Sequence, residues 1–139
     1  MKKILVVIIF VLILTGCRSD LVCTRKSSER GVSVEERYVT TFEDNKIATI
    51  TWTYTSALTG SEITPSHVDN TLRTAEAQAE IFNSLEGVTS TVDAGGRRIV
   101  MKTTFIIAEM DEMDIIRLHL FLDRDNYREL KVDSGFTCR

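Results

Sequence analysis

Hydrophobic residues fall on one face of an alternating pattern in two adjacent segments, residues 32–42 and 48–55. The inward positions of the first segment are Val32, Val34, Tyr38 and Phe42. The polar positions that alternate with Ile50, Trp52 and Tyr54 in the second are Thr49, Thr51, Thr53 and Thr55. A period of two is typical of strands, and the polar stretch 43–46 between the segments has turn chemistry. The pattern predicts a β-hairpin with an aromatic inner face and a threonine-rich outer face.

The spacing changes to three and four residues after position 64. Thr64 supplies a capping hydroxyl and Pro65 stands at the first helical position, which is a typical helix start. Apolar residues then fall on one helical face, at Val68, Leu72, Ala75, Ala79, Phe82 and Leu85. Gly87 follows them, and we expect the helix to end there.

A second hairpin is predicted in the next part of the chain. Residues 88–93 form a short strand candidate, Gly95 and Gly96 a turn, and residues 98–108 a longer alternating strand. Residues 110–122 favour a helix with three acids in its first turn. Asp125 is expected to cap a last short helix that ends near Gly135.

These elements predict the fold class. Their order is ββα-ββα(α), and the polar segment 24–31 before them is assigned to no element. We therefore expect one α+β domain, with an antiparallel sheet of about four strands in two hairpins and two to three helices packed on one face.

The N-terminus has the features of an export signal. Lys2 and Lys3 precede an unbroken apolar run from Ile4 to Leu14, which is too short for a spanning helix of about 20 residues. The run ends in Leu14-Thr15-Gly16-Cys17, which resembles the lipobox of bacterial lipoproteins. The resemblance implies that residues 1–16 are a signal peptide that is removed, and that Cys17 is diacylated and becomes the mature N-terminus. Two acyl chains are enough for stable membrane anchoring.

Two cysteines remain after lipidation, Cys23 and Cys138. In an oxidising compartment such an even pair predicts a disulfide, with two free thiols as the alternative. A bridge would close a loop of about 115 residues, which the chain-entropy model values at about 4 to 5 kcal/mol. Residues 17–22 would then be a tether of roughly 20 Å at full extension, which would hold the exported domain, residues 23–139, close to the bilayer.

Charge and composition exclude several functions. Removal of Lys2 and Lys3 from the 17 basic residues leaves 15 against 20 acidic ones, a formal charge of −5. A body this acidic is a poor candidate for nucleic acid, which needs clustered Lys and Arg. The two histidines, His67 and His119, have no cysteine or carboxylate at metal-ligand spacing. Since no catalytic or phosphate-binding motif occurs either, we expect no cofactor and no metal.

Two kinds of function remain open. The first is a non-enzymatic, monomeric module that binds an envelope protein or ligand, with Thr49, Thr51, Thr53 and Thr55 as its possible binding face. The second is a small envelope hydrolase or metal-dependent enzyme that uses Asp111, Glu112 and Asp114. Acids at an exposed helix start favour the charged form, which argues against an acid catalyst. A concave apolar pocket beneath Trp52 and Tyr54 would favour a small molecule over a protein partner.

The chain also resembles the small YehR-like bacterial lipoproteins. The resemblance is carried by the lipobox, Trp52-Thr53-Tyr54, Leu85-Glu86-Gly87-Val88 and Gly135-Phe136-Thr137-Cys138. It implies an α+β domain on the extracytoplasmic side of a bacterial membrane, held there by lipid through Cys17. It implies no functional residue beyond that cysteine.

Overall fold

The computed structural model describes residues 20–139, as six strands, three α-helices and one 3₁₀-helix. The strands are β1 (Leu21–Glu29), β2 (Val32–Glu43), β3 (Lys46–Leu58), β4 (Val88–Gly95), β5 (Arg98–Ile106) and β6 (Thr137–Cys138). The helices are α2 (Pro65–Asn83), α3 (Glu112–Arg117) and α4 (Arg124–Asp133), with the 3₁₀-helix η1 (Ile107–Glu109) before α3. The expected α+β class is confirmed.

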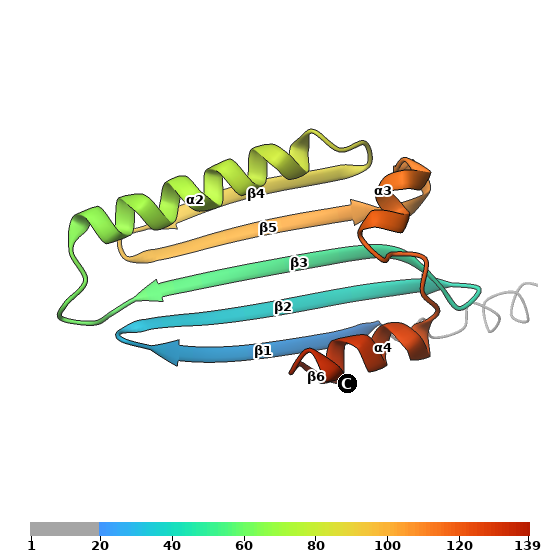
Figure 1. Ribbon diagram of the computed structural model, residues 1–139, viewed down its shortest axis with the longest axis horizontal. Coiled ribbons are helices and arrows are strands. Elements are labelled where there is room, and N and C mark those ends of the chain that lie inside the picture. The colour runs from blue at the N-terminus through green and yellow to red at the C-terminus, as the bar shows by residue number, and fades with distance from the viewer. Residues whose placement is uncertain (1–19) are drawn as a thin grey trace, which may run out of the picture.

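All described strands belong to one antiparallel sheet with the order β4-β5-β3-β2-β1-β6. The helices lie on one face of it, with α2 along β4 and β5 and α4 at the opposite edge (Figure 1). Phe82 of α2 contacts Trp52 of β3, with ring centroids 5.8 Å apart, and Tyr127 of α4 contacts Phe42 of β2 at 6.2 Å. The centre of the helix-bearing face, over β2 and β3, therefore lies between two helices.

The prediction of about four strands in the order ββα-ββα(α) was wrong. The observed order begins βββα, because the segment assigned to no element forms most of β1. Only the first residues of β1 contribute to the core: Leu21 and Cys23 are buried, whereas residues 25–29 are exposed. An outer strand that pairs through its backbone needs no hydrophobic alternation, and charges on it discourage aggregation. Arg30 and Gly31, both with positive φ, join it to β2 as a two-residue turn.

The sixth strand depends on the predicted disulfide. Cys23 of β1 is bonded to Cys138 of β6, and the two residues also face each other in the strand register. Val22 and Arg139 exchange two backbone hydrogen bonds of 3.0 Å beside the bridge. The expected disulfide between Cys23 and Cys138 is thus confirmed. The two-residue strand β6 carries too little pattern to be predicted.

The helix ends differ from expectation in three places. α2 ends at Asn83, four residues before Gly87, where the helix was expected to end. Thr64 caps α2 as predicted, because its hydroxyl accepts from the His67 backbone N–H while His67 Nδ1 accepts from the Thr64 N–H. The predicted helix 110–122 is only six residues long, since His119 adopts φ 56° and turns the chain. Asp123, rather than Asp125, caps α4 by accepting from the Asn126 N–H at 3.0 Å.

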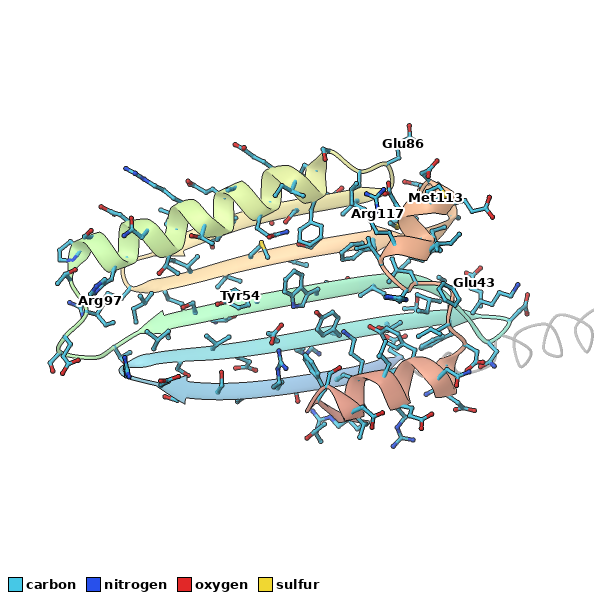
Figure 2. The ribbon with its side chains drawn as sticks, in the orientation of Figure 1. Glu43, Tyr54, Glu86, Arg97, Met113 and Arg117 are labelled. Carbon is cyan, nitrogen blue, oxygen red and sulfur yellow. A yellow bond between two sulfur atoms is a disulfide. The ribbon has the colours of Figure 1, made fainter. Side chains whose placement is uncertain are left out.

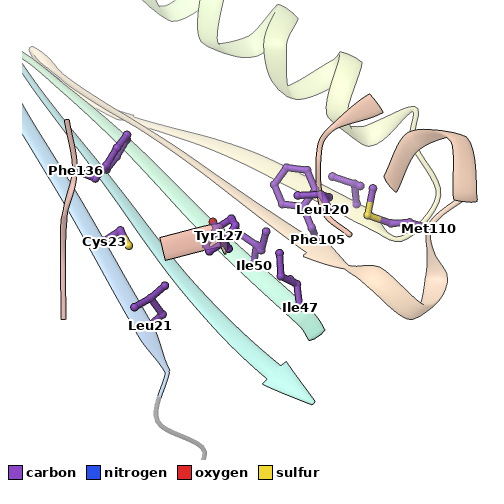
Figure 3. Close-up of a cluster of buried hydrophobic side chains, with 10 residues drawn as sticks. Leu21, Cys23, Ile47, Ile50, Phe105, Met110, Leu120, Tyr127 and Phe136 are labelled. Carbon is purple, nitrogen blue, oxygen red and sulfur yellow. The ribbon is translucent and has the colours of Figure 1, made fainter. Parts of the chain in front are cut away.

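The core lies between the helices and the sheet in two clusters. The larger contains the buried side chains drawn in Figure 3, among them Leu21, Ile50, Phe105, Tyr127 and Phe136. The smaller lies under the N-terminal half of α2 and contains Leu58, Ile63, Ala75 and Ile99. Tyr54 and Glu36 belong to neither cluster and are half-buried, so the part of the sheet that carries them is only partly covered.

Two glycines bring the β1–β2 turn against the loop that leads to α2. The backbone N–H groups of Thr59 and Gly60 both donate to the Gly31 carbonyl, at 2.8 and 3.0 Å. A Cβ on Gly60 would lie 2.7 Å from the Gly31 Cα, a distance that backbone atoms do not tolerate. The close approach fixes where the loop leaves the sheet and thus where α2 begins.

Loss of the disulfide is expected to destabilise the domain strongly. We expect the Cys23→Ala/Cys138→Ala double variant, or the native chain with reductant, to lose about 3 to 5 kcal/mol of unfolding free energy, because the unfolded chain regains its loop entropy. Urea unfolding with and without dithiothreitol measures this. Reductant should leave the double variant unchanged, and a native chain insensitive to reductant would contradict the expectation.

The contact between the glycines provides a second prediction. Gly60→Ala is expected to cost about 1 to 3 kcal/mol of unfolding free energy, because the new methyl group must displace backbone. Gly95→Ala is the matched control, since no atom lies within 4 Å of the added Cβ there. Equal stability of the two variants in urea unfolding would show that the loop moves without cost.

Candidate functional site

An elongated cavity lies on the helix-bearing face between α2 and the centre of the sheet. Its volume is about 440 Å³, and we call it the Trp52 groove. Its lining residues are Glu36, Trp52, Tyr54, Asn70, Thr71, Thr74, Ala75, Gln78 and Met101. Figure 2 shows Tyr54 on the part of the face that no helix covers. A concave pocket at Trp52 and Tyr54 is the feature that distinguishes a small-molecule site from a flat protein contact.

Aromatic side chains form the floor of this region because they alternate inward along paired strands. Tyr38 of β2 stands opposite Trp52 of β3 in the register, and their rings are stacked with centroids 5.8 Å apart. Tyr54, two residues farther along β3, meets the Trp52 ring edge at 6.3 Å. The predicted aromatic inner face is confirmed, and Trp52 is held by ring contacts on several sides.

One wall of the groove is polar and comes from a single face of α2. It consists of Asn70, Thr71, Thr74 and Gln78, which recur at helical spacing. The hydroxyl groups of Thr71 and Thr74 donate to backbone carbonyls one turn earlier, at 2.8 and 2.9 Å. Their remaining lone pairs are directed outward, so these threonines act as acceptors in the groove.

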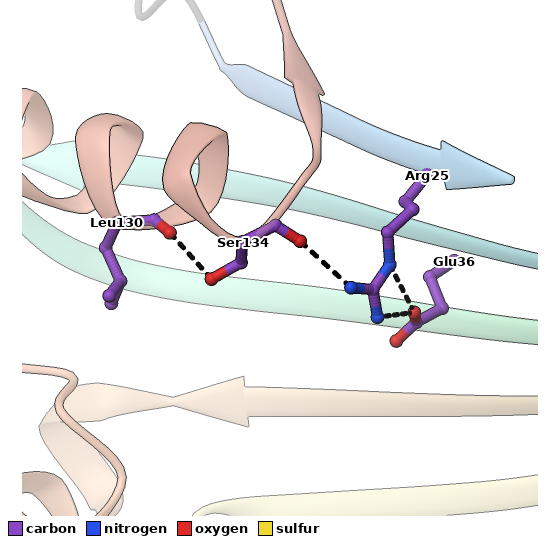
Figure 4. A network of polar contacts seen from close by, with 4 residues as sticks. All are labelled: Arg25, Glu36, Leu130 and Ser134. Carbon is purple, nitrogen blue, oxygen red and sulfur yellow. Dashed lines mark hydrogen bonds and ion pairs between the residues drawn. The ribbon is translucent and has the colours of Figure 1, made fainter.

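Glu36 is the one acidic residue that lines the groove, and Arg25 neutralises it. The Arg25 Nε donates to the Glu36 carboxylate at 3.0 Å, and its Nη2 forms an ion pair with the same oxygen (Figure 4). Arg25 Nη1 also donates to the Ser134 carbonyl at 2.9 Å. Only 14% of the Glu36 side chain is exposed, so this ion pair is screened less than a surface pair.

A second cavity of about 280 Å³ lies on the other side of Trp52, beneath α4, and we call it the Lys131 cavity. It is lined by Tyr38, Ile50, Trp52, Phe82, Phe105, Leu118, His119, Leu120, Tyr127, Leu130 and Lys131. Most of these residues belong to the larger core cluster or pack against it. The Lys131 cavity is therefore more apolar than the Trp52 groove, and Lys131 is its only strongly basic lining residue.

Three aromatic rings surround the ammonium group of Lys131. Its Nζ lies 3.2 Å from the Tyr38 ring centroid, 5.1 Å from that of Phe136 and 5.5 Å from that of Tyr127. Burial lowers the pKa of Lys131 to about 8, with the Glu36 carboxylate opposing this shift and Arg25 adding to it. The rings hold the cation in the Lys131 cavity, where it contacts their π faces.

The two tyrosines in this cage are also perturbed. Burial raises the pKa of Tyr127 to about 12, while a hydrogen bond from the Thr40 hydroxyl at 3.2 Å opposes the rise. Burial, reinforced by the Glu36 charge, raises the pKa of Tyr38 further. Both phenols stay protonated at neutral pH, so the cage offers Lys131 neutral rings.

The threonines predicted as a binding face lie on the opposite side of the sheet. Thr49, Thr51, Thr53 and Thr55 alternate with the inward side chains of β3, so they face away from the helices. Thr49 is hydrogen-bonded to Thr41: their hydroxyl groups share a hydrogen bond of 2.7 Å, and the Thr49 N–H donates to Thr41 Oγ1 at 3.2 Å. None of these four residues lines either cavity.

The predicted acidic cluster does not converge on one point. Asp111 caps α3 by accepting from the Met113 N–H at 2.8 Å, and Asp114 forms an ion pair with Arg117 at 3.4 Å. Glu112 is exposed. Within residues 20–139, the structure contains no group of three or more His, Cys, Asp or Glu that could hold a metal ion.

Other residues singled out from the sequence have local roles. His67 completes the cap of α2, and His119 contacts Phe121 at 6.3 Å in the turn after α3. Asp123 is the helix cap of α4, and hydrogen bonds from Asn126 lower its pKa. Cys17, the predicted site of lipidation, and the predicted signal peptide lie outside the described residues. In the part of the chain that is described, no helix has the length and apolarity to cross a membrane.

Sequence reasoning missed the residues that make the groove. Asn70, Thr71, Thr74 and Gln78 belong to the polar side of an amphipathic helix, which looks like any solvated surface. One signal was present: Glu36 occupies an inward position of β2, between Val34 and Tyr38, where a charge is costly to bury. Its partner Arg25 is 11 residues away, on the strand that was not predicted.

The Lys131 site predicts an unusual pH dependence of stability. The folded pKa of about 8 lies below the ordinary 10.5, so between these values the unfolded chain binds more protons and stability rises with pH. We expect the unfolding free energy to rise by about 1 to 2 kcal/mol from pH 7 to pH 9.5, relative to Lys131→Met. Above pH 10 the raised pKa of Tyr127 acts in the opposite direction.

Urea unfolding of both chains at each pH provides the measurement. Lys131→Met keeps the length and apolar stem of the side chain, so it removes the titrating group with little change of volume. Parallel pH profiles for the two chains would contradict a perturbed lysine.

Comparisons with known proteins leave the groove without a precedent. The chain matches no protein-family model, no curated protein and no solved structure. No functional residue is therefore carried over from another protein, and the case for a function rests on the Trp52 groove itself.

Proposed function

We propose that this protein is a non-enzymatic binding module that holds a small amphipathic molecule in the Trp52 groove. The observation that supports this most directly is the concave cavity of about 440 Å³ floored by Trp52 and Tyr54. Ligand pockets typically measure roughly 300 to 1,000 Å³, with apolar walls and a few placed polar groups. The groove has this composition, since its aromatic floor faces the amides and hydroxyls of α2.

The rigidity of the floor favours binding. Trp52 contacts Tyr38, Tyr54 and Phe82, each with ring centroids no more than 6.3 Å apart. A side chain that is already fixed loses little conformational entropy when a ligand arrives. The sheet behind it is tied across its edge by the disulfide between Cys23 and Cys138. A preformed pocket of this kind favours ligand binding over a function that requires the surface to rearrange.

The proposed location of the module is the extracytoplasmic side of a bacterial membrane. It rests on the lipobox-like sequence before Cys17 and on the resemblance to YehR-like lipoproteins. β1 begins at Leu21, four residue steps after Cys17, a reach of roughly 14 Å when extended. A lipid on Cys17 would therefore hold the sheet, and the groove with it, close to the membrane surface.

A neutral apolar dye tests the proposal. The chain has one tryptophan, so its fluorescence reports on the groove. We expect N-phenyl-1-naphthylamine to bind saturably to the chain from residue 17, carrying Cys17→Ser, and to accept energy from Trp52. Tyr54→Ala should weaken this binding about tenfold, because loss of one stacking wall removes about 1.4 kcal/mol.

Thr53→Ala is the matched control, since Thr53 neighbours Tyr54 on β3 but faces the other side of the sheet. It should leave dye affinity unchanged. Urea unfolding of each variant establishes that the fold is intact. Absence of saturable energy transfer, or equal losses in the two variants, would count against the groove as the binding site.

A further inference from the structure

The Trp52 groove has no net charge once the ion pair of Glu36 is counted. Glu36 is the only charged side chain among its lining residues, and Arg25, which is not one of them, is paired with it. Lys131 rests on the Tyr38 ring and lines the neighbouring cavity, not the groove. An anionic ligand would meet no available cation in the groove, and a cationic ligand would have to displace Arg25. The groove therefore favours a neutral ligand.

The hydrogen-bonding groups in the groove need a ligand that both donates and accepts. Thr71 and Thr74 offer lone pairs, because their hydrogens are used within α2. Asn70 and Gln78 each offer an amide oxygen and an NH₂ group. Such a mixture of acceptors and donors along one wall matches a row of hydroxyl groups, each of which donates one hydrogen bond and accepts others.

Two buried donors on the groove side of β3 lack a partner. Within residues 20–139, Trp52 Nε1 and Ser56 Oγ are the buried side-chain polar atoms without a hydrogen bond. Ser56 is 1% exposed and follows Trp52 and Tyr54 on the same face of the strand. Of these two residues, Trp52 lines the groove and Ser56 does not. Leaving a buried donor unpaired is unfavourable, so a ligand with oxygen acceptors beside Trp52 could satisfy its Nε1.

The floor favours a ligand with one apolar face. Trp52 and Tyr54 present aromatic surfaces, and Met101 adds a thioether beside them. A pyranose ring has C–H groups on its faces and hydroxyls around its rim. Its polarised C–H bonds suit the negative face of an aromatic ring, while the rim meets the polar wall.

A third cavity extends the groove along α2. It measures about 470 Å³ and shares Asn70 and Thr71 with the Trp52 groove. Its other lining residues include Arg30 and Glu62, one of each charge, so it too carries no clear excess of either sign. A ligand longer than a single ring could continue from one cavity into the other.

We propose that the ligand of the Trp52 groove is a neutral saccharide of two or more rings, stacked on Trp52 and Tyr54 and hydrogen-bonded by α2. This inference rests on the proposed binding function and specifies its ligand class. The source that fits an envelope location is a glycan chain, and the chemistry is that of uncharged pyranose rings.

Competition with the dye separates this inference from the proposed function. The probes are N,N′-diacetylchitobiose, maltose and cellobiose, together with an array of other neutral oligosaccharides. We expect at least one neutral saccharide to displace N-phenyl-1-naphthylamine and to shift Trp52 emission. Dye binding that no neutral saccharide on the array displaces would overturn the ligand class and leave the groove in place.

Conversion of the polar wall to an apolar one provides the decisive variant. Asn70→Leu/Gln78→Leu should lower saccharide affinity at least tenfold while dye affinity is kept or increased, because only hydroxyl recognition is lost. Arg73→Leu/Glu80→Leu is the matched control, since both residues are exposed on α2, neither lines the groove, and their joint replacement keeps the net charge. This control should bind saccharide as the native chain does. Saccharide affinity that survives in the Asn70→Leu/Gln78→Leu variant would also overturn the inference.

Discussion

Tyr38 and Trp52 stand opposite each other on β2 and β3, the two strands of the central hairpin, and their ring pair contacts the other parts of the domain. Trp52 meets Phe82 of α2, whereas Tyr38 meets Phe136 near the C-terminus and the ammonium group of Lys131 on α4. Helices α2 and α4, on opposite sides of the sheet's helix-bearing face, thus both contact this one pair of side chains. Large rings supply much buried area for little conformational entropy, which suits a small domain with a thin core.

The groove follows from how that layer is distributed. Because α2 lies over β4 and β5 while α4 lies over the opposite edge, no helix covers the middle of the sheet at Tyr54 (Figure 2). Strands β2 and β3 have 12 and 13 residues and run past the aromatic pair, so their inward side chains continue beyond the packed region. Because the helices cover only part of the long sheet, an aromatic floor remains open beside the polar side of α2.

The charges near the groove satisfy one another inside the fold. Arg25 bonds Glu36 and the carbonyl of Ser134, and its guanidinium lies 4.5 Å from the Phe136 ring centroid. The ammonium group of Lys131 lies against three aromatic rings, and its burial there lowers its pKa. These contacts join β1, β2 and α4 beside the disulfide, so the edge of the sheet formed by β1 and β6 is held by covalent, ionic and cation–π interactions together.

Features that depend on local pattern could be predicted from the sequence. The alternation around Trp52 defined the inner and outer faces of the hairpin, the Thr64-Pro65 start located α2, and the pair of cysteines left after Cys17 predicted the bridge.

Features that depend on partners distant in the chain required the folded molecule. β1 is a strand because β2 pairs with it, although its outer half is polar, and β6 exists because Cys138 is tied to Cys23. The groove combines Glu36, Trp52 and Gln78 from three separate elements, and no local periodicity records that they meet. Polar side chains on a helix look alike in sequence whether they face water or a cavity, because only the packing of that helix on the sheet distinguishes the two.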